Sequence, residues 1–364
     1  TFDEIKKFRI LRGDVLITKD SEEWDDIAVP SFVKETLETV LCGYHLALVR
    51  PKSGMIDGKY LFRTFQSYIV NSQFRLSANG ITRYGLSKNS ISSAVFLVPP
   101  LPEQQAIADF LDQKTTKIDE LLKKNEKLIE LLKEKRQAVI SQSVTKGLDP
   151  NAKMKDSGIE WIGEIPRHWN IEPLGINSRL IVPMRDKPPA FDGEIPWIRI
   201  EDFDGKYISD SKSDQRVSDD IVKAMHLKIY PIGTVLCSCS CDMGATAIVT
   251  KPLTSNQTFI GIVPSSRLDS GYLYYLMQVA KVHLNVISTG AIQQYLSKND
   301  FSRLRIPSPD VKEQRAIADY IDRETSKLDT LVSKIREHIA RLHEYRTALI
   351  SAAVTGKIDV HGSN

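Results

Sequence analysis

The stretch EQQAIADFLDQKTTKIDELL, which begins at Glu103, recurs 210 residues later as EQRAIADYIDRETSKLDTLV from Glu313. Aligned without gaps, 22 of the 47 positions that start at these two residues are identical. The repeat extends upstream, where LSKN from Leu86 matches LSKN from Leu296. Self-similarity at a fixed offset indicates a duplication, so the chain is expected to contain two copies of one arrangement.

Each copy has the pattern of one long helix, because apolar residues recur at alternating four- and three-residue steps. Pro102 and Pro309 stand where a first helical turn tolerates proline, and Gly147 and Gly356 stand where the helices should end. Each helix is expected to span about 40 residues, or roughly 60 Å. The predicted apolar stripe comprises Ile107, Leu111, Ile118, Leu121, Leu128, Leu132 and Val139 in the first copy, and Ile317, Ile321, Leu328, Leu331, Ile335, Leu342 and Leu349 in the second.

A stripe that narrow cannot be buried by one helix alone, so the two copies are expected to pair as an antiparallel coiled coil. Antiparallel pairing would put the globular regions that precede the two helices at opposite ends of the pair. Asn125 falls on an otherwise apolar stripe position, where it either fixes the register or occupies a solvent-tolerant site. The mixed charges on the remaining surface favour a solvated coiled-coil face over a DNA-binding patch.

Outside the helices, short β-rich runs are separated by Gly, Pro, Asn and Asp, which is typical of mixed α/β (α+β) domains. GDVLI from Gly13 resembles GTVLC from Gly233, so the two globular regions share a plan although their loops differ. The expected fold is therefore two globular domains joined by two long helices. Strands are predicted at residues 195–200, 233–238, 247–250 and 259–263. The predicted parts are residues 1–100 and 151–307 for the domains, and residues 101–150 and 308–364 for the helices and the tail.

Composition and motifs restrict the classes of function. The net charge of +3 permits a polyanionic partner without requiring one. No run approaches the roughly 18 apolar residues of a membrane helix and no leader is recognised, so a cytoplasmic location is expected. No phosphate loop, GxSxG, HExxH or NPPY-like run is present, which argues against a catalytic site or a bound cofactor. Cys237, Cys239 and Cys241 would share one face of a strand, but they lack CxxC spacing and a histidine pair, so no metal is predicted.

Three groups of residues carry a family resemblance. LPEQQAIADFLD pairs with VKEQRAIADYID, the helix tails end in AVISQSVTKGLD and ALISAAVTGKID, and MKDSGIEWIGEIPRHW begins at Met154. Together they resemble type I restriction-modification specificity subunits over essentially the whole chain. The resemblance implies two target-recognition domains, each of which reads one half of a split site in double-stranded DNA. It also implies that the helices set the gap between the halves and dock two modification (methyltransferase) subunits.

The same resemblance assigns the chemistry to partner subunits. S-adenosylmethionine belongs to the modification subunits, and ATP-dependent translocation and cutting belong to the restriction subunits, so S-adenosylmethionine, ATP and Mg are not expected on this chain. The specificity subunit itself is implied to have no catalytic site.

One feature departs from the pattern of that family. The run from Met154 precedes the strand at Gly233 by about 70 residues, whereas the matching strand of the first half begins at Gly13. The first domain is therefore expected to lack its N-terminal part, with exposed core surface and sheet edges as the consequence. The alternative function is a truncated or silent subunit that binds its partners but reads its first half-site poorly.

The candidate DNA contacts are residues that hydrogen-bond to bases or phosphates, such as Arg, Lys, Asn, Gln and hydroxyl side chains. They come from two matching loops, SANGITRYGLSKN and STGAIQQYLSKND, in which a shared frame surrounds differing residues. For any one of them, a plain surface residue is the competing interpretation. The candidates are Asn79, Thr82, Arg83, Tyr84 and Lys88 in the first loop, Ser288, Thr289, Gln293, Gln294 and Lys298 in the second, and Arg179, Arg185, Lys187, Arg199 and Lys206 elsewhere in the second domain.

Two other classes of protein fit the sequence less well. A pure coiled-coil interaction protein would explain the helices but not the two diverged domains within identical frames. An enzyme built around the cysteines would need a metal and a carboxylate in a cleft, and neither is indicated.

Overall fold

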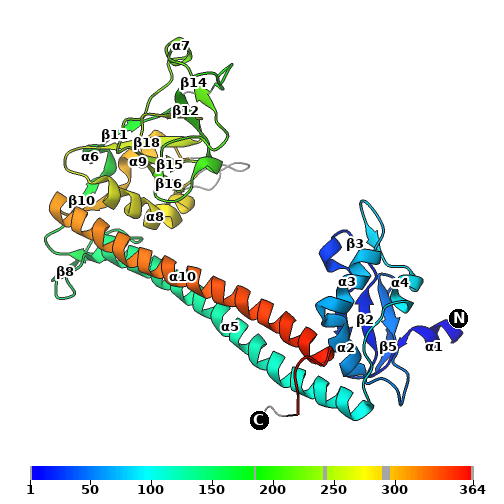
Figure 1. Cartoon of the computed structure of the whole chain (residues 1–364). Coiled ribbons are helices and arrows are strands. Elements are labelled where there is room, and N and C mark those ends of the chain that lie inside the picture. Colours follow the sequence, from blue (N-terminus) through cyan, green and yellow to red (C-terminus); the bar gives the residue numbers. More distant parts are fainter. Residues whose placement is uncertain (1, 184–185, 241–243, 289–295, 362–364) are drawn as a thin grey trace. The chain divides into compact units, whose positions relative to one another are not determined.

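The computed structural model divides into two compact units (Figure 1). The first unit is residues 1–130 with 332–364, and the second is residues 131–331. Each unit contains a globular domain and a stretch of both long helices. The described residues are 2–183, 186–240, 244–288 and 296–361.

Both repeated stretches form single helices. Helix α5 spans Leu101–Lys146 and helix α10 spans Val311–Val354, which are 46 and 44 residues and slightly longer than the sequence predicts. Gly147 and Gly356 follow them in left-handed conformations, with φ of 73° and 70°, which favour glycine. The helix ends therefore lie where the glycines predict them.

The antiparallel pairing of the helices is confirmed in each unit. In the first unit, Arg346 Nε lies 3.1 Å from Asp119 Oδ1, and the Asn125 amide lies 3.3 Å from His338 Nδ1. Residue numbers thus rise along α5 as they fall along α10, and the polar Asn125 has a partner on the opposite helix. The second unit continues this order with an ion pair of 3.3 Å that links Arg136 of α5 to Asp329 of α10.

The predicted apolar stripe is wrong at three positions. Leu121 and Leu128 are each 44% exposed, whereas their neighbours Leu122 and Ile129 are 8% exposed. The buried line passes through Thr115, and steps of three and four residues from there reach the neighbours. A search for apolar residues alone omits that threonine, and the predicted stripe then continues one residue away from the buried one. The third misplaced residue is Leu331, which is 47% exposed.

The globular part of the first unit is a small sheet covered by helices. Strand β2 lies between β4 and β6, and α2 packs on this sheet. Val15, Ile17, Phe65 and Phe74 are buried in one apolar cluster, so this region has a core of its own. Its elements are α1 (Phe2–Phe8), β1 (Arg9–Ile10), β2 (Val15–Thr18), β3 (Asp20–Ser21), η1 (Trp24–Asp26), β4 (Pro30–Phe32), β5 (Leu37–Leu41), β6 (Leu46–Val49), α2 (Gly58–Gln66), α3 (Tyr68–Ser77), β7 (Tyr84–Gly85) and α4 (Lys88–Ser92).

The globular part of the second unit has a five-stranded sheet of order β11-β18-β15-β16-β13, and α8 packs against β15 and β16. A second, smaller sheet has the order β14-β12-β17, and its strands are interspersed along the chain with those of the larger sheet. Its elements are β8 (Met154–Asp156), β9 (Glu164–Pro166), β10 (Asn170–Pro173), α6 (Leu174–Asn177), β11 (Ser178–Ile181), β12 (Ile195–Ile198), η2 (Ile200–Asp202), β13 (Tyr207–Ile208), β14 (Arg216–Val217), α7 (Asp219–Ala224), β15 (Val235–Ser238), β16 (Thr246–Val249), β17 (Thr254–Ser255), β18 (Phe259–Pro264), α8 (Ser270–Ile287), α9 (Lys298–Arg303) and β19 (Arg305–Ser308).

The shared plan of the two domains is visible in their sheets. Strand β2 is flanked by antiparallel β4 and β6, just as β15 is flanked by antiparallel β16 and β18. Gly13 and Gly233 precede the two central strands, both with positive φ, so the matching glycines have one backbone role. The predicted relation of GDVLI to GTVLC is therefore confirmed, while a missing N-terminal part remains a prediction.

The two helix-ending glycines provide a matched test of packing. A Cβ on Gly147 would lie 3.1 Å from Trp169 Cζ2, whereas a Cβ on Gly356 meets nothing within 4 Å. We expect Gly356→Ala to cost about 1–2 kcal/mol through its left-handed backbone alone, and Gly147→Ala to cost more. Urea unfolding of the two variants measures the difference, and equal losses would contradict the described packing of Trp169.

Candidate nucleic-acid interface and its dock

The predicted reading loop of the first unit is a closed turn. Asn79 and Gly85 exchange backbone hydrogen bonds of 3.0 and 2.8 Å, and strand β7 pairs with β3. The Leu86 amide donates to the Lys19 carbonyl at 2.7 Å. These bonds hold both ends of the loop, while Ile81 at its tip is 94% exposed. The loop is therefore presented to solvent from a fixed base.

Charged and aromatic side chains gather beside this loop. Arg83 donates to Asp20 Oδ1 at 3.0 Å, and His45 also contacts that carboxylate. Tyr44, which is 80% exposed, lies under the Lys19 ammonium at 4.5 Å from its ring centre. Burial raises the pKa of the Asp20 carboxyl, but His45 and Arg83 outweigh it and hold the pKa below its ordinary value.

This cluster offers the groups that nucleic acids bind. Arg, Lys and His donate to phosphates and base edges, and an exposed tyrosine adds a flat face and a hydroxyl. The sequence predicted Arg83 and Tyr84 but missed Lys19, Tyr44 and His45. These three lie in the connections between β2 and β3 and between β5 and β6, and the pairing of β3 with β7 and the Lys19–His45 backbone hydrogen bond bring them to the loop.

The second unit has a backbone hydrogen bond that matches the one made by Leu86. The Leu296 amide donates to the Cys239 carbonyl at 3.0 Å, as Leu86 does to Lys19. Ser288 ends α8, and the exposed Lys298 begins α9, as Lys88 begins α4. The candidates between them, Thr289, Gln293 and Gln294, lie outside the described residues.

The other basic candidates of the second domain are dispersed. Arg179 is exposed on β11, opposite Val263 of β18. Lys187 is exposed, with its ammonium 5.7 Å from the Phe191 ring centre. Arg185 lies outside the described residues.

Two basic candidates are already paired within the protein. Arg199 forms a 2.9 Å ion pair with Glu201 and donates to Ser213. Lys206, whose side chain is 15% exposed, donates to both oxygens of Asp322 at 2.7 and 2.6 Å. Lys206 therefore joins the globular domain to α10, and its role as a DNA contact remains an untested prediction.

The described cysteines of the cysteine run are packed in the core. Cys237 of β15 and Cys239 are buried, and burial raises the pKa of the Cys237 thiol. Cys241 lies outside the described residues. In the described part of the chain, no group of three or more His, Cys, Asp or Glu residues is placed to hold a metal ion.

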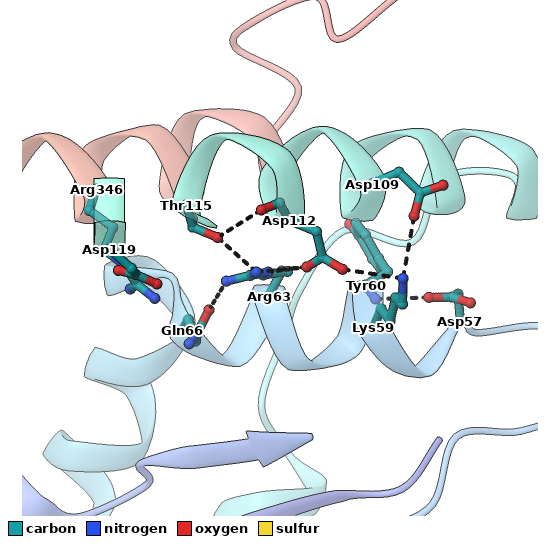
Figure 2. A network of polar contacts seen from close by, with 10 residues as sticks. All are labelled: Asp57, Lys59, Tyr60, Arg63, Gln66, Asp109, Asp112, Thr115, Asp119 and Arg346. Carbon is teal, nitrogen blue, oxygen red and sulfur yellow. Dashed lines mark hydrogen bonds and ion pairs between the residues drawn. The ribbon is translucent and has the colours of Figure 1, made fainter. Parts of the chain in front are cut away.

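The first domain contacts α5 at a set of polar residues centred on Asp112, called its dock below, as Figure 2 shows. Arg63 of α2 donates through Nη2 to Asp112 Oδ1 at 2.6 Å and to Thr115 Oγ1 at 2.9 Å. Lys59, one turn earlier on α2, lies 3.2 Å from Asp112 Oδ2. The Arg63 side chain is 8% exposed, whereas the Asp112 side chain is 39% exposed, so the guanidinium is buried and the carboxylate is partly open to solvent. Gln66 supports it by accepting from Arg63 Nη1 at 2.9 Å.

The second domain docks on α10 at the matching residue, because Asp322 is Asp112 displaced by the repeat of 210. Its partners differ, however: Lys206 contacts both carboxylate oxygens and the Tyr275 hydroxyl donates to one of them. Burial raises the pKa of Tyr275, which keeps this hydroxyl protonated as a donor. The helix position is thus retained while the domain side chains have changed.

A pair of glutamines makes the same contact twice. Gln104 Oε1 accepts from the Asp57 amide at 2.8 Å, and Gln314 Oε1 accepts from the Asp269 amide at 2.7 Å. Both glutamines are completely buried. Each aspartate caps the next helix of its domain, α2 or α8, so each glutamine joins a long helix to a capped helix start.

Comparison with known proteins identifies this arrangement. The model of the family described as "Type I restriction modification DNA specificity domain" matches residues 1–131 and 183–341. The chain belongs to this family. It is 24% identical to the type I restriction enzyme MjaX specificity subunit of Methanocaldococcus jannaschii, over 98% of this chain and 81% of that protein. It is 33% identical to the MjaIX specificity subunit of the same organism, over 43% of this chain and 38% of that protein.

Solved structures support the fold of this specificity subunit. A chain from work on complex assembly and conformational transition of the type I R-M system superposes with a TM-score of 0.75 at 18% identity, over 96% of this chain and 83% of that one. The HsdS subunit from Thermoanaerobacter tengcongensis gives a TM-score of 0.61, also at 18% identity, over 96% of this chain and 82% of that one.

Membership of the family defines the class of protein. The chain is a specificity subunit of a type I restriction-modification system, a DNA-recognition protein without a catalytic role of its own. It acts with DNA and with other subunits of that system. Among the described residues, no helix is long and apolar enough to cross a membrane.

The dock of the first unit has a testable dependence on pH. Burial raises the pKa of Asp112, but Arg63 and Lys59 outweigh it and hold the pKa below its ordinary value. A lowered folded pKa contributes stability that is complete above the usual carboxyl value of about 3.9 and disappears as the pH falls through the folded value. We expect acid to weaken the dock over that window in the wild type but not in Asp112→Asn.

Hydrogen exchange in α2 as a function of pH measures this effect. At neutral pH, Asp112→Asn should lower the free energy of opening of α2 by on the order of 1–3 kcal/mol. Arg63 stays buried in this variant but loses its charged acceptor. Asp109→Asn is the matched control, since its 75% exposed carboxylate lies 3.5 Å from Lys59. The assignment of Asp112 as the anchor is wrong if both variants respond alike.

Proposed function

We propose that each unit reads one half of a bipartite site in double-stranded DNA. The observation that carries this proposal is the pair of matching docks, at Asp112 and Asp322, for two domains that present unlike loops at the same tied position. A constant frame with variable loops suits a protein whose halves recognise different sequences, because base contacts specify and the frame only positions them. Lys19, Tyr44, His45, Arg83 and Lys88 are the proposed contacts of the first unit.

We further infer that α5 and α10 set the number of base pairs between the halves and dock two modification subunits. Uninterrupted helices of 46 and 44 residues support the spacer role, since the length of an α-helix depends on its number of residues. The subunits that carry methyl transfer, and the restriction subunits that carry ATP-driven cutting, would supply S-adenosylmethionine, ATP and Mg. Such an assembly would act on DNA in the cytoplasm.

Methylation mapping tests the bipartite reading. The chain is expressed with its modification subunits, and methyladenine is located by long-read sequencing of genomic DNA. We expect a split motif that is absent without this chain. Exchange of residues 1–100 for the corresponding domain of a relative should change one half of the motif and leave the other half and the gap intact. A continuous motif, or one that changes in both halves, would falsify the proposal.

The matching lysines test where the duplex backbone runs. We expect Lys88→Ala and Lys298→Ala to weaken DNA binding by the assembled complex on all sequences, and to reduce the slope of log Kobs against log salt by about 1 each, because a phosphate contact releases one counterion. Fluorescence anisotropy at several salt concentrations measures the slope. Lys52→Ala, an exposed lysine of the first unit away from the loop, should leave it unchanged, and an equal loss there would refute the location.

A further inference from the structure

In the second unit, a buried tryptophan belongs to the apolar cluster that joins α5, α10 and the globular domain. Strand β10 pairs antiparallel with β19, and Trp169, just before β10, is completely buried. Its ring lies against Gly147 at the end of α5. The preceding His168 places Nε2 3.0 Å from Glu313 Oε2 of α10. The segment Ile162–Pro173 is thus held by strand pairing, by an apolar pocket and by a carboxylate.

The first unit contains the same frame, displaced by the repeat. The Tyr60 hydroxyl donates to Leu97 O at 2.8 Å, and lies 3.4 Å from Val354 O. Gln104 donates to Pro99 O at 2.7 Å. The counterparts in the second unit are Tyr272 with Pro307 O at 3.2 Å and Val144 O at 3.1 Å, and Gln314 with Pro309 O at 2.8 Å.

The place of Trp169 is open in this frame. A cavity of about 240 Å³ lies there, and Leu97 and Val98 at its edge are 58% and 51% exposed. By contrast, Pro307 in strand β19, which matches Leu97, is buried. The cavity is lined by Leu97, Val98, Pro99, Glu103, Ile107, Val354 and Gly356, and the repeat matches most of these to residues of the second unit around Trp169.

Two backbone N–H groups of the same segment are available for strand pairing. Pro307 has no N–H and its carbonyl accepts from Tyr272, so the hydrogen bonds of β19 to β10 fall to Ile306 and Ser308. Their counterparts are Phe96 and Val98. For these two N–H groups, the structure records no hydrogen bond to any described residue. An apolar segment with unpaired amides can bind an added strand.

We propose that residues 95–98 and the adjoining cavity form a binding site for a tryptophan-bearing polypeptide strand with the pattern of Ile162–Pro173. The strand pairs antiparallel with residues 95–98, and its indole enters the cavity against Val354 and Gly356. Its histidine reaches Glu103, as His168 reaches Glu313. This site is distinct from the proposed DNA-reading loop, so it is tested without DNA.

A synthetic peptide of residues 162–174, IGEIPRHWNIEPL, is the probe, and it is added to the whole chain. Titration calorimetry is expected to show saturable binding of one peptide. Replacing tryptophan by alanine in the peptide should weaken binding by about tenfold or more, because the buried aromatic anchor carries most of the affinity. Hydrogen exchange should show new protection at residues 95–98. Absence of saturable binding, or equal affinity of the two peptides, overturns the proposal.

A matched pair of variants locates the peptide. Leu97→Lys places a charge at the rim of the cavity and should weaken binding by about tenfold or more, since the ammonium would have to be desolvated. Leu76→Lys makes the same change at an 82% exposed leucine of α3 outside the cavity and should leave binding intact. Both leucines are exposed, so neither substitution threatens the fold. Equal losses, or no loss in Leu97→Lys, would place the peptide elsewhere and overturn the proposal.

Discussion

A narrow buried stripe on a helix of more than 40 residues requires a second helix along its length, and this constraint organises the whole subunit. Thr115 and Thr325 lie on the buried stripes of α5 and α10, and both are almost completely buried. Because the helices come from one duplicated sequence, each presents the same residues to the domain that docks on it. The packing of the helices therefore dictates where both recognition domains attach.

The two docks show which side of the contact between helix and domain tolerates change. Asp112 accepts from Arg63, whereas Asp322 accepts from Lys206 and Tyr275, so three kinds of donor serve one helix position. A carboxylate accepts several donors from different directions, which lets the domain side of the contact diverge while the helix side is retained. The helix carboxylates therefore allow the two domains to diverge without loss of the dock.

The repeat and its periodicity predicted the helices, their ends, their antiparallel order and the common plan of the two sheets. The prediction weakened where one residue type has several roles. Lys206 was predicted to contact DNA, which stays a prediction, and its ion pair with the distant Asp322 was not foreseen. Lys19, Tyr44 and His45 were missed, because strand pairing and a backbone hydrogen bond bring them to Arg83. Contacts between segments far apart in sequence leave no local pattern, whereas a helix stripe does.

Duplication also makes each half a reference for the other. Where the halves agree, as at Gln104 and Gln314, the shared contact belongs to the frame and not to the DNA sequence that is read. The halves also share the backbone hydrogen bond that follows each loop, from Leu86 to Lys19 and from Leu296 to Cys239, although the loop sequences differ. The contacts of the frame are therefore the same in both halves, although the loop residues between them differ in sequence.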